Sequence, residues 1–158
     1  MTSSLLAGYR DRLVRMDLTH TWRGYGSAIF LEFGALTQRT RRDGSPGELK
    51  GELGAMIQWS WRIEGRNSII CGSWSDDALW EAALLQLRES IVANVEVFGK
   101  LPELAIELSN GHRIVSFMTA EGDPQWTLFD RRSPTTRWLC VRDGRVVEQA
   151  STTLTSIR

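Results

Sequence analysis

Histidine and cysteine are scarce in this chain of 158 residues, which contains two of each. His20 and His112 have no second histidine or cysteine at ligand spacing, so the sequence predicts no metal centre and no cofactor. Cys71 and Cys140 lie in apolar, strand-like stretches, where a thiol behaves as a small buried hydrophobic group. A disulfide or a redox role for the two thiols is the alternative.

Long hydrophobic runs and an excess of one charge are also absent. No apolar run approaches the roughly 18 residues that a membrane span needs, and the first residues lack the pattern of a secretory signal. Nineteen basic residues balance nineteen acidic ones. Because a neutral chain has no long-range field that attracts polyanions, we expect a soluble, cytoplasmic protein that binds neither membrane nor nucleic acid.

Signatures of catalysis are missing as well. In "GYGSAIFLEFG", Gly24 and Gly26 precede a strand, whereas a dinucleotide site needs its glycines between a strand and a helix. These glycines therefore predict a bend that leads into the strand. Asp76 and Asp77 suit the start of a helix, and His20 is the one candidate left for proton transfer. The sequence favours a protein that is not an enzyme.

Alternation and turn residues predict most of the strands. In "AMIQWSWRIE" every second residue is apolar, which predicts one strand whose buried face carries Ala55, Ile57, Trp59, Trp61 and Ile63. Asp143-Gly144 predicts a hairpin, and Asp43-Gly44 marks a polar, basic tip between two strands.

The turn Asn110-Gly111 predicts a further hairpin. A two-residue turn at this point places Leu104 opposite Phe117 and Ile106 opposite Val115, and we expect these four side chains to be buried.

The spacing of apolar residues predicts one main helix over residues 76–93, with Ser75 before it as the N-cap. Its apolar stripe consists of Leu79, Trp80, Ala83, Leu84, Leu87 and Ile91. The start of the chain fits a short helix less well because of Gly8. Together the patterns predict a single α+β domain over residues 1–158, with a mostly antiparallel sheet of eight or nine strands that form two similar β-units.

Seven tryptophans are the most unusual feature of the composition. Most belong in a core, but Trp, Tyr and Arg are also enriched at the centres of protein interfaces. The candidate binding residues are therefore Trp22, Arg23 and Tyr25 beside the glycine bend, and the arginines of the polar tip, Arg39, Arg41 and Arg42. Ordinary packing and a solvated tip are the alternatives.

The segments "GYGSAIFLEFG", "GELGAMIQWSWRIEG" and "SIICGSWSDD" resemble those of a group of small uncharacterised bacterial proteins. More loosely, they are similar to immunity-type proteins, which neutralise partner toxins. The resemblance implies a non-catalytic domain that binds another protein. Self-association through an exposed strand edge and a small-molecule binder or enzyme are the alternatives.

Overall fold

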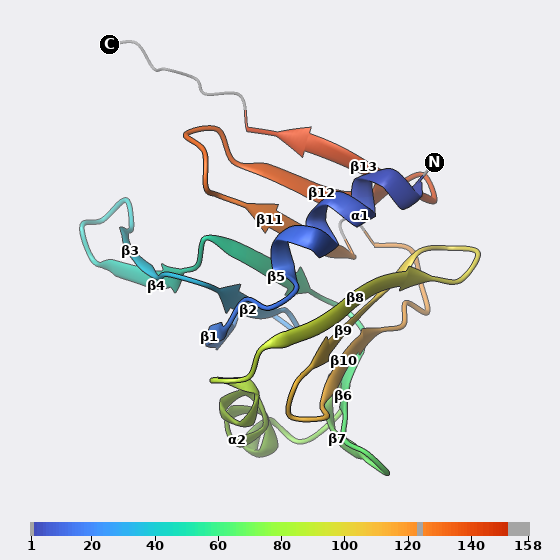
Figure 1. The fold of residues 1–158 in the computed structure, drawn as a ribbon. Coiled ribbons are helices and arrows are strands. Elements are labelled where there is room, and N and C mark those ends of the chain that lie inside the picture. Colours follow the sequence, from blue (N-terminus) through green and yellow to red (C-terminus); the bar gives the residue numbers. More distant parts are fainter. Residues whose placement is uncertain (1, 123–124, 152–158) are drawn as a thin grey trace.

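The structure is a computed structural model that describes residues 2–122 and 125–151 (Figure 1). Its helices are α1 (Thr2–Leu13) and α2 (Asp77–Leu87). Its strands are β1 (Leu18–Arg23), β2 (Ile29–Phe33), β3 (Thr37–Thr40), β4 (Pro46–Lys50), β5 (Leu53–Ile57), β6 (Trp61–Glu64), β7 (Ile69–Gly72), β8 (Val92–Phe98), β9 (Glu103–Leu108), β10 (Arg113–Ser116), β11 (Trp126–Asp130), β12 (Arg137–Arg142) and β13 (Arg145–Ala150). The predicted α+β class with mostly antiparallel sheet is confirmed, with more strands than the eight or nine expected.

The strands form two large sheets and one hairpin that projects from the side of the molecule (Figure 1). The six-stranded sheet has the order β1-β2-β5-β11-β12-β13, and the five-stranded sheet has the order β7-β6-β10-β9-β8. The third sheet pairs β3 with β4. Every strand pair is antiparallel, as the hairpin turns of the sequence require.

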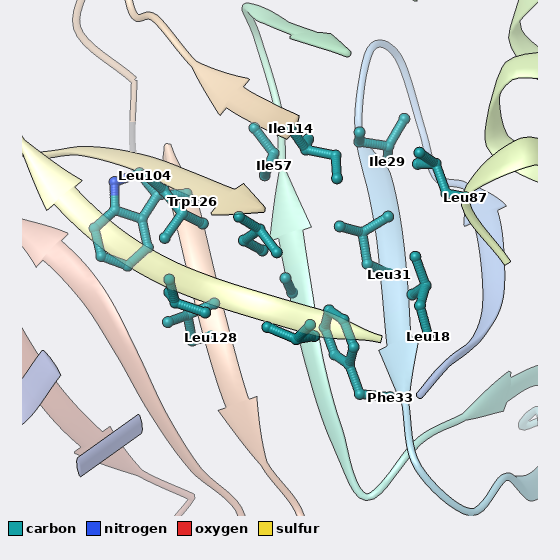
Figure 2. Close-up of a cluster of buried hydrophobic side chains, with 14 of the residues drawn as sticks. Leu18, Ile29, Leu31, Phe33, Ile57, Leu87, Leu104, Ile114, Trp126 and Leu128 are labelled. Carbon is teal, nitrogen blue, oxygen red and sulfur yellow. The ribbon is translucent and has the colours of Figure 1, made fainter. Parts of the chain in front are cut away.

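The core lies between the two large sheets. Figure 2 shows Leu31, Ile57 and Trp126 of the six-stranded sheet facing Leu104 and Ile114 of the other sheet. Helix α1 contacts β8 and β13, and α2 contacts β1 and β7, so the helices close two opposite sides of this core. The other face of the six-stranded sheet, here called its outer face, carries the side chains that alternate with the core residues.

The predicted strand over residues 55–64 is wrong at its centre. The chain leaves the six-stranded sheet after Ile57 and enters the five-stranded sheet at Trp61. Trp59 stands at the corner with a φ of 69° and is 54% exposed, although alternation placed it in the core. A chain that changes sheet must keep its apolar side chains on the shared core, and the residue at the corner is left outside.

The Asn110-Gly111 hairpin forms, but its register differs by one residue from the predicted one. Ile114, not Val115, is paired with Ile106. The amide of Leu108 donates to the carbonyl of His112 across a loop of three residues, in which only Gly111 has a positive φ, of 90°. A two-residue type I′ turn would need two such residues.

Burial in this hairpin follows the observed register. Leu104, Ile106 and Val115 are buried as expected, whereas Phe117 is half-buried. Val115 reaches its buried position on the face of the sheet away from the core, beside Ala105.

Helix α2 is shorter than the predicted helix over residues 76–93. Arg88 is extended, and the amide of Leu18 donates to the carbonyl of Ser90, so the chain after Leu87 pairs with the start of β1. Trp80, Ala83, Leu84 and Leu87 are buried as predicted, whereas Leu79 and Ile91 are exposed. The N-cap is Asp76 and not Ser75, and the Asp76 side chain makes no capping hydrogen bond.

Two other expectations are confirmed, one on the last hairpin and one on the burial of the cysteines. The β12–β13 hairpin turns at Asp143-Gly144, where both residues have positive φ. Cys71 and Cys140 are buried, and no disulfide joins them. Residues 152–158, at the end of the chain, lie outside the described residues. Within the described part of the chain, neither helix has the length and apolar character that crossing a membrane demands.

Candidate functional site

The six candidate binding residues fall in three places. Trp22, Arg39 and Arg41 line one groove, with Arg42 beside it at the hairpin tip. Arg23 lies on the opposite face of β1, and Tyr25 lies in the turn between β1 and β2.

The first place, here called the basic groove, lies between the β3–β4 hairpin and the outer face of β1. It has a volume of about 280 Å³ and is lined by Trp22, Arg39, Thr40, Arg41, Gly47, Glu48 and Lys50. Among the residues that the structure describes, no carboxylate lies within ion-pair distance of Arg39, Arg41 or Arg42. The groove therefore presents uncompensated positive charge.

Trp22 and Lys50 form the floor of the basic groove. The Trp22 ring stacks on Phe30 with ring centroids 3.9 Å apart, and the Lys50 Nζ lies 4.4 Å from the centroid of Trp22. Burial lowers the pKa of Lys50, and the charges of Arg131 and Arg39 act in the same direction, while Glu32 and Glu48 oppose them. The ammonium is thus held on an aromatic surface beside other cations.

A buried carboxylate holds this floor in place. Glu32 of β2 is fully buried and accepts hydrogen bonds from Trp22 Nε1 (2.9 Å), the amide of Gly51 (3.0 Å) and Arg131 Nη1 (2.9 Å). A Cβ atom at Gly54 would lie 2.9 Å from both Arg131 Nη1 and Glu32 Oε1, so a larger residue there would displace the end of one of these side chains. Trp22 is consequently positioned from two sides, by Glu32 and by Phe30.

The second place, here called the β1–α2 groove, has a volume of about 480 Å³. The guanidinium of Arg23 lies 3.9 Å over the ring of Trp80 and 3.4 Å from Asp77. Arg88 donates to the carbonyl (2.7 Å) and the hydroxyl (3.0 Å) of Thr21 on the edge of β1. Positively and negatively charged side chains both line this groove, which suits a small ligand with one positive and one negative group.

His20 also lines the β1–α2 groove, and its Nε2 lies 3.3 Å from Glu48. The neighbouring hydroxyl of Thr21 is engaged by other groups: it donates to the carbonyl of Leu84 (3.1 Å) and accepts from Arg88 Nε (3.0 Å). In the described ranges, no group of three or more His, Cys, Asp and Glu side chains is placed to hold a metal ion.

The third place, here called the aromatic end, consists of Tyr25, Trp59 and Trp74 on three neighbouring loops. Hydrogen bonds join the loops: the amide of Trp59 donates to Ser27 Oγ (2.9 Å), and Trp61 donates through Nε1 to the Ser27 carbonyl (2.7 Å) and through its amide to Ser73 Oγ (3.1 Å). Tyr25 is 100% exposed, Trp74 88% and Trp59 54%. Three large aromatic side chains thus face solvent on loops that hydrogen bonds join.

Sequence reasoning missed several of these residues. Trp74 stands between two serines just before α2, a polar setting that indicates exposure. Glu32 is the single charge within an apolar strand, and such a charge indicates a buried ion pair. No sequence signal links it to Arg131, which is 99 positions away. Comparison of the chain with protein-family models, curated proteins and solved structures finds no match, so no residue role is transferred from a relative.

Proposed function

We propose that this chain is a non-catalytic, cytoplasmic protein-binding domain and that the aromatic end is its contact surface. The exposure of Tyr25, Trp59 and Trp74 on joined loops supports the proposal. Large aromatic side chains stabilise a fold when they are buried, and at the surface they are enriched where partner proteins bind. They lose little side-chain entropy on binding and bury a large area.

The resemblance of the sequence to immunity-type proteins suggests a specific form of this function. In that form the partner is a toxin, and the domain binds and neutralises it. Exposed loops on a rigid pair of sheets suit such a role, because the scaffold holds the contact residues in place before binding.

An affinity-capture experiment with the wild-type protein and a matched variant tests the proposal. Wild-type protein and the double variant Tyr25→Ala/Trp74→Ala are immobilised and exposed to lysate of the source cells. We expect one protein to be retained in stoichiometric amount by the wild type and lost from the double variant. The purified partner should then bind at least tenfold more weakly to the variant in calorimetry, since aromatic anchors dominate interface energies.

Leu101→Ala supplies the control, because Leu101 is 63% exposed and lies outside the aromatic end. This variant should retain the partner as the wild type does. Equal retention by the wild type and the double variant would contradict the aromatic end as the contact surface.

The second candidate function is small-molecule binding in the β1–α2 groove, favoured by the meeting of His20, Arg23 and Asp77 in one hollow. A thermal-shift screen with amino acids, nucleotides and divalent metal ions distinguishes the two functions. Saturable stabilisation by a compound, lost in Arg23→Ala, would favour the second candidate. A protein-binding domain gives no such shift, whereas its partner at about 100 times Kd stabilises it by about 2.7 kcal/mol.

A further inference from the structure

We propose that the basic groove is a second binding site, which takes an acidic segment of a polypeptide. Carboxylates of Asp or Glu side chains would meet Arg39, Arg41 and Lys50 in the groove, and Arg42 at the tip would meet those that extend beyond it. Arginine is well suited to this role because its planar guanidinium can bind a carboxylate through two hydrogen bonds.

The pairing of arginines across the molecule supports the assignment. Seven other arginines form ion pairs within the chain, namely Arg12, Arg23, Arg62, Arg113, Arg131, Arg132 and Arg137. Arg39, Arg41 and Arg42 have no ion pair among the described residues, and neither do Arg10, Arg15, Arg66, Arg88 and Arg145. The hairpin differs from these in that three such arginines lie within four positions of the sequence. The β3–β4 hairpin also contains two carboxylates, Asp43 and Glu48, but neither forms an ion pair with these arginines.

Those carboxylates are directed at other groups. Asp43 accepts hydrogen bonds from the amide and the hydroxyl of Ser45, which lower the pKa of the Asp43 carboxyl. Glu48 faces His20 across 3.3 Å. Burial and repulsion from Arg39 lower the pKa of Lys50, while Glu32 and Glu48 raise it. Neither carboxylate pairs with Arg39 or Arg41, so the charges of these two arginines are left for a ligand to bind.

The groove fits a polypeptide better than a nucleic acid. A single strand needs successive aromatic faces on which its bases stack, and Trp22 is the one aromatic side chain among the lining residues. One face of that ring is already stacked on Phe30. Glu48 also lies in the lining, where it repels a phosphate chain charged at every step, whereas a polypeptide can place an uncharged residue there.

The test is a titration of a fluorescent deca-glutamate peptide with the full chain at 50 mM and at 300 mM salt. A fluorescent deca-thymidylate is titrated in the same way as the nucleic acid for comparison. We expect saturable binding of the peptide that weakens at least tenfold at the higher salt, because exposed charges are screened. The double variant Arg39→Glu/Arg41→Glu should weaken binding at least tenfold at the lower salt. The double variant Arg66→Glu/Arg145→Glu changes the net charge equally on other hairpins and should leave binding unchanged.

Three results would overturn the proposal: no saturable binding of the peptide, equal loss in the two double variants, or tighter binding of deca-thymidylate than of the peptide. Circular dichroism of each variant confirms that the fold is kept, and Lys50→Met repeats the test without a charge reversal. The variant Tyr25→Ala/Trp74→Ala should bind the peptide as the wild type does, so this proposal and the proposed function fail independently.

Discussion

Glu32 carries its charge at a position with no exposed surface, and three donors compensate it. A buried ion pair contributes little when both partners are present, because desolvation offsets the attraction. Removal of one partner is different, since the other then remains buried without compensation. If Glu32 is removed, the charge of Arg131, whose side chain is only 8% exposed, stays buried without a partner carboxylate.

A double-mutant cycle tests this account. Glu32→Ala should lower the free energy of unfolding by about 3–5 kcal/mol, because Arg131 is left uncompensated. Glu32→Ala/Arg131→Ala should lower it by less than the sum of the two single changes. Urea unfolding followed by tryptophan fluorescence measures all four proteins. Strict additivity would show that the two side chains are not coupled.

Gly111 matters at the residue scale because its φ of 90° is disfavoured for residues with a Cβ atom. Gly111→Val should destabilise the protein by about 1 kcal/mol or more in the same unfolding experiment. Gly8→Ala, within α1, is a suitable comparison: a Cβ there contacts only the flexible end of Arg12, at 3.7 Å, so it should not destabilise. An unchanged midpoint for Gly111→Val would mean that the loop adopts another conformation.

At the scale of elements, Trp80 attaches α2 to the sheets. It is 2% exposed, meets Trp61 edge to face at 4.8 Å and donates its Nε1 hydrogen to the Ser75 carbonyl. Trp80→Ala should cost roughly 3–5 kcal/mol, because a large cavity opens between α2 and the core. Leu85→Ala, on the exposed side of the same helix, should cost far less. A melting temperature that Trp80→Ala leaves unchanged would contradict this packing.

Helix α1 is attached in part through Tyr9, whose hydroxyl donates to Glu148 of β13 at 2.9 Å. Burial, followed by the hydrogen bond and the charge of Glu148, raises the pKa of Tyr9 well above its ordinary value near 10. Above pH 10 the tyrosine ionises more readily in the unfolded chain than in the folded one. The stability that Tyr9 contributes is therefore complete below about pH 10 and is lost as the pH rises further.

Tyr9→Phe tests this linkage. At pH 7 the variant should be less stable than the wild type by about 1 kcal/mol, since the hydrogen bond is lost. Between pH 9 and 11 the wild type should lose stability more steeply than the variant, so the difference shrinks. Urea unfolding of both proteins at each pH measures this difference in stability. Parallel plots of stability against pH for the two proteins would contradict a raised pKa for Tyr9.

At the scale of the whole molecule, side chains from both large sheets and both helices contribute to one buried cluster. We therefore predict that the chain unfolds as a single domain. Far-UV circular dichroism and tryptophan fluorescence should give coincident transitions in urea. Two separated transitions would show that the sheets are independent units. Self-association through a strand edge stays a prediction, which light scattering of the purified protein tests.

Turn chemistry and alternation act between neighbouring residues, and they were sufficient to predict the class of fold, the Asp143-Gly144 hairpin and the buried face of α2. The same local signals failed where a distant segment intervened. Asn110 donates through its side chain to the carbonyl of Gln86 in α2, and the hairpin loop that contains Asn110 is one residue longer than predicted. The end of α2 likewise depends on pairing with Leu18, which lies about 70 positions earlier.

The candidate sites follow the same division. Arg39, Arg41 and Arg42 were recognisable as a basic loop because they are close in sequence. The meeting of Arg39 and Arg41 with Trp22 and Lys50 depends on how the β3–β4 hairpin lies against β1. Trp59 has the apolar, alternating position of a core residue, yet it is exposed because the chain changes sheets there. Periodicity describes which side of a strand faces inward, whereas the point at which a strand leaves its sheet depends on the packing of two sheets around one core.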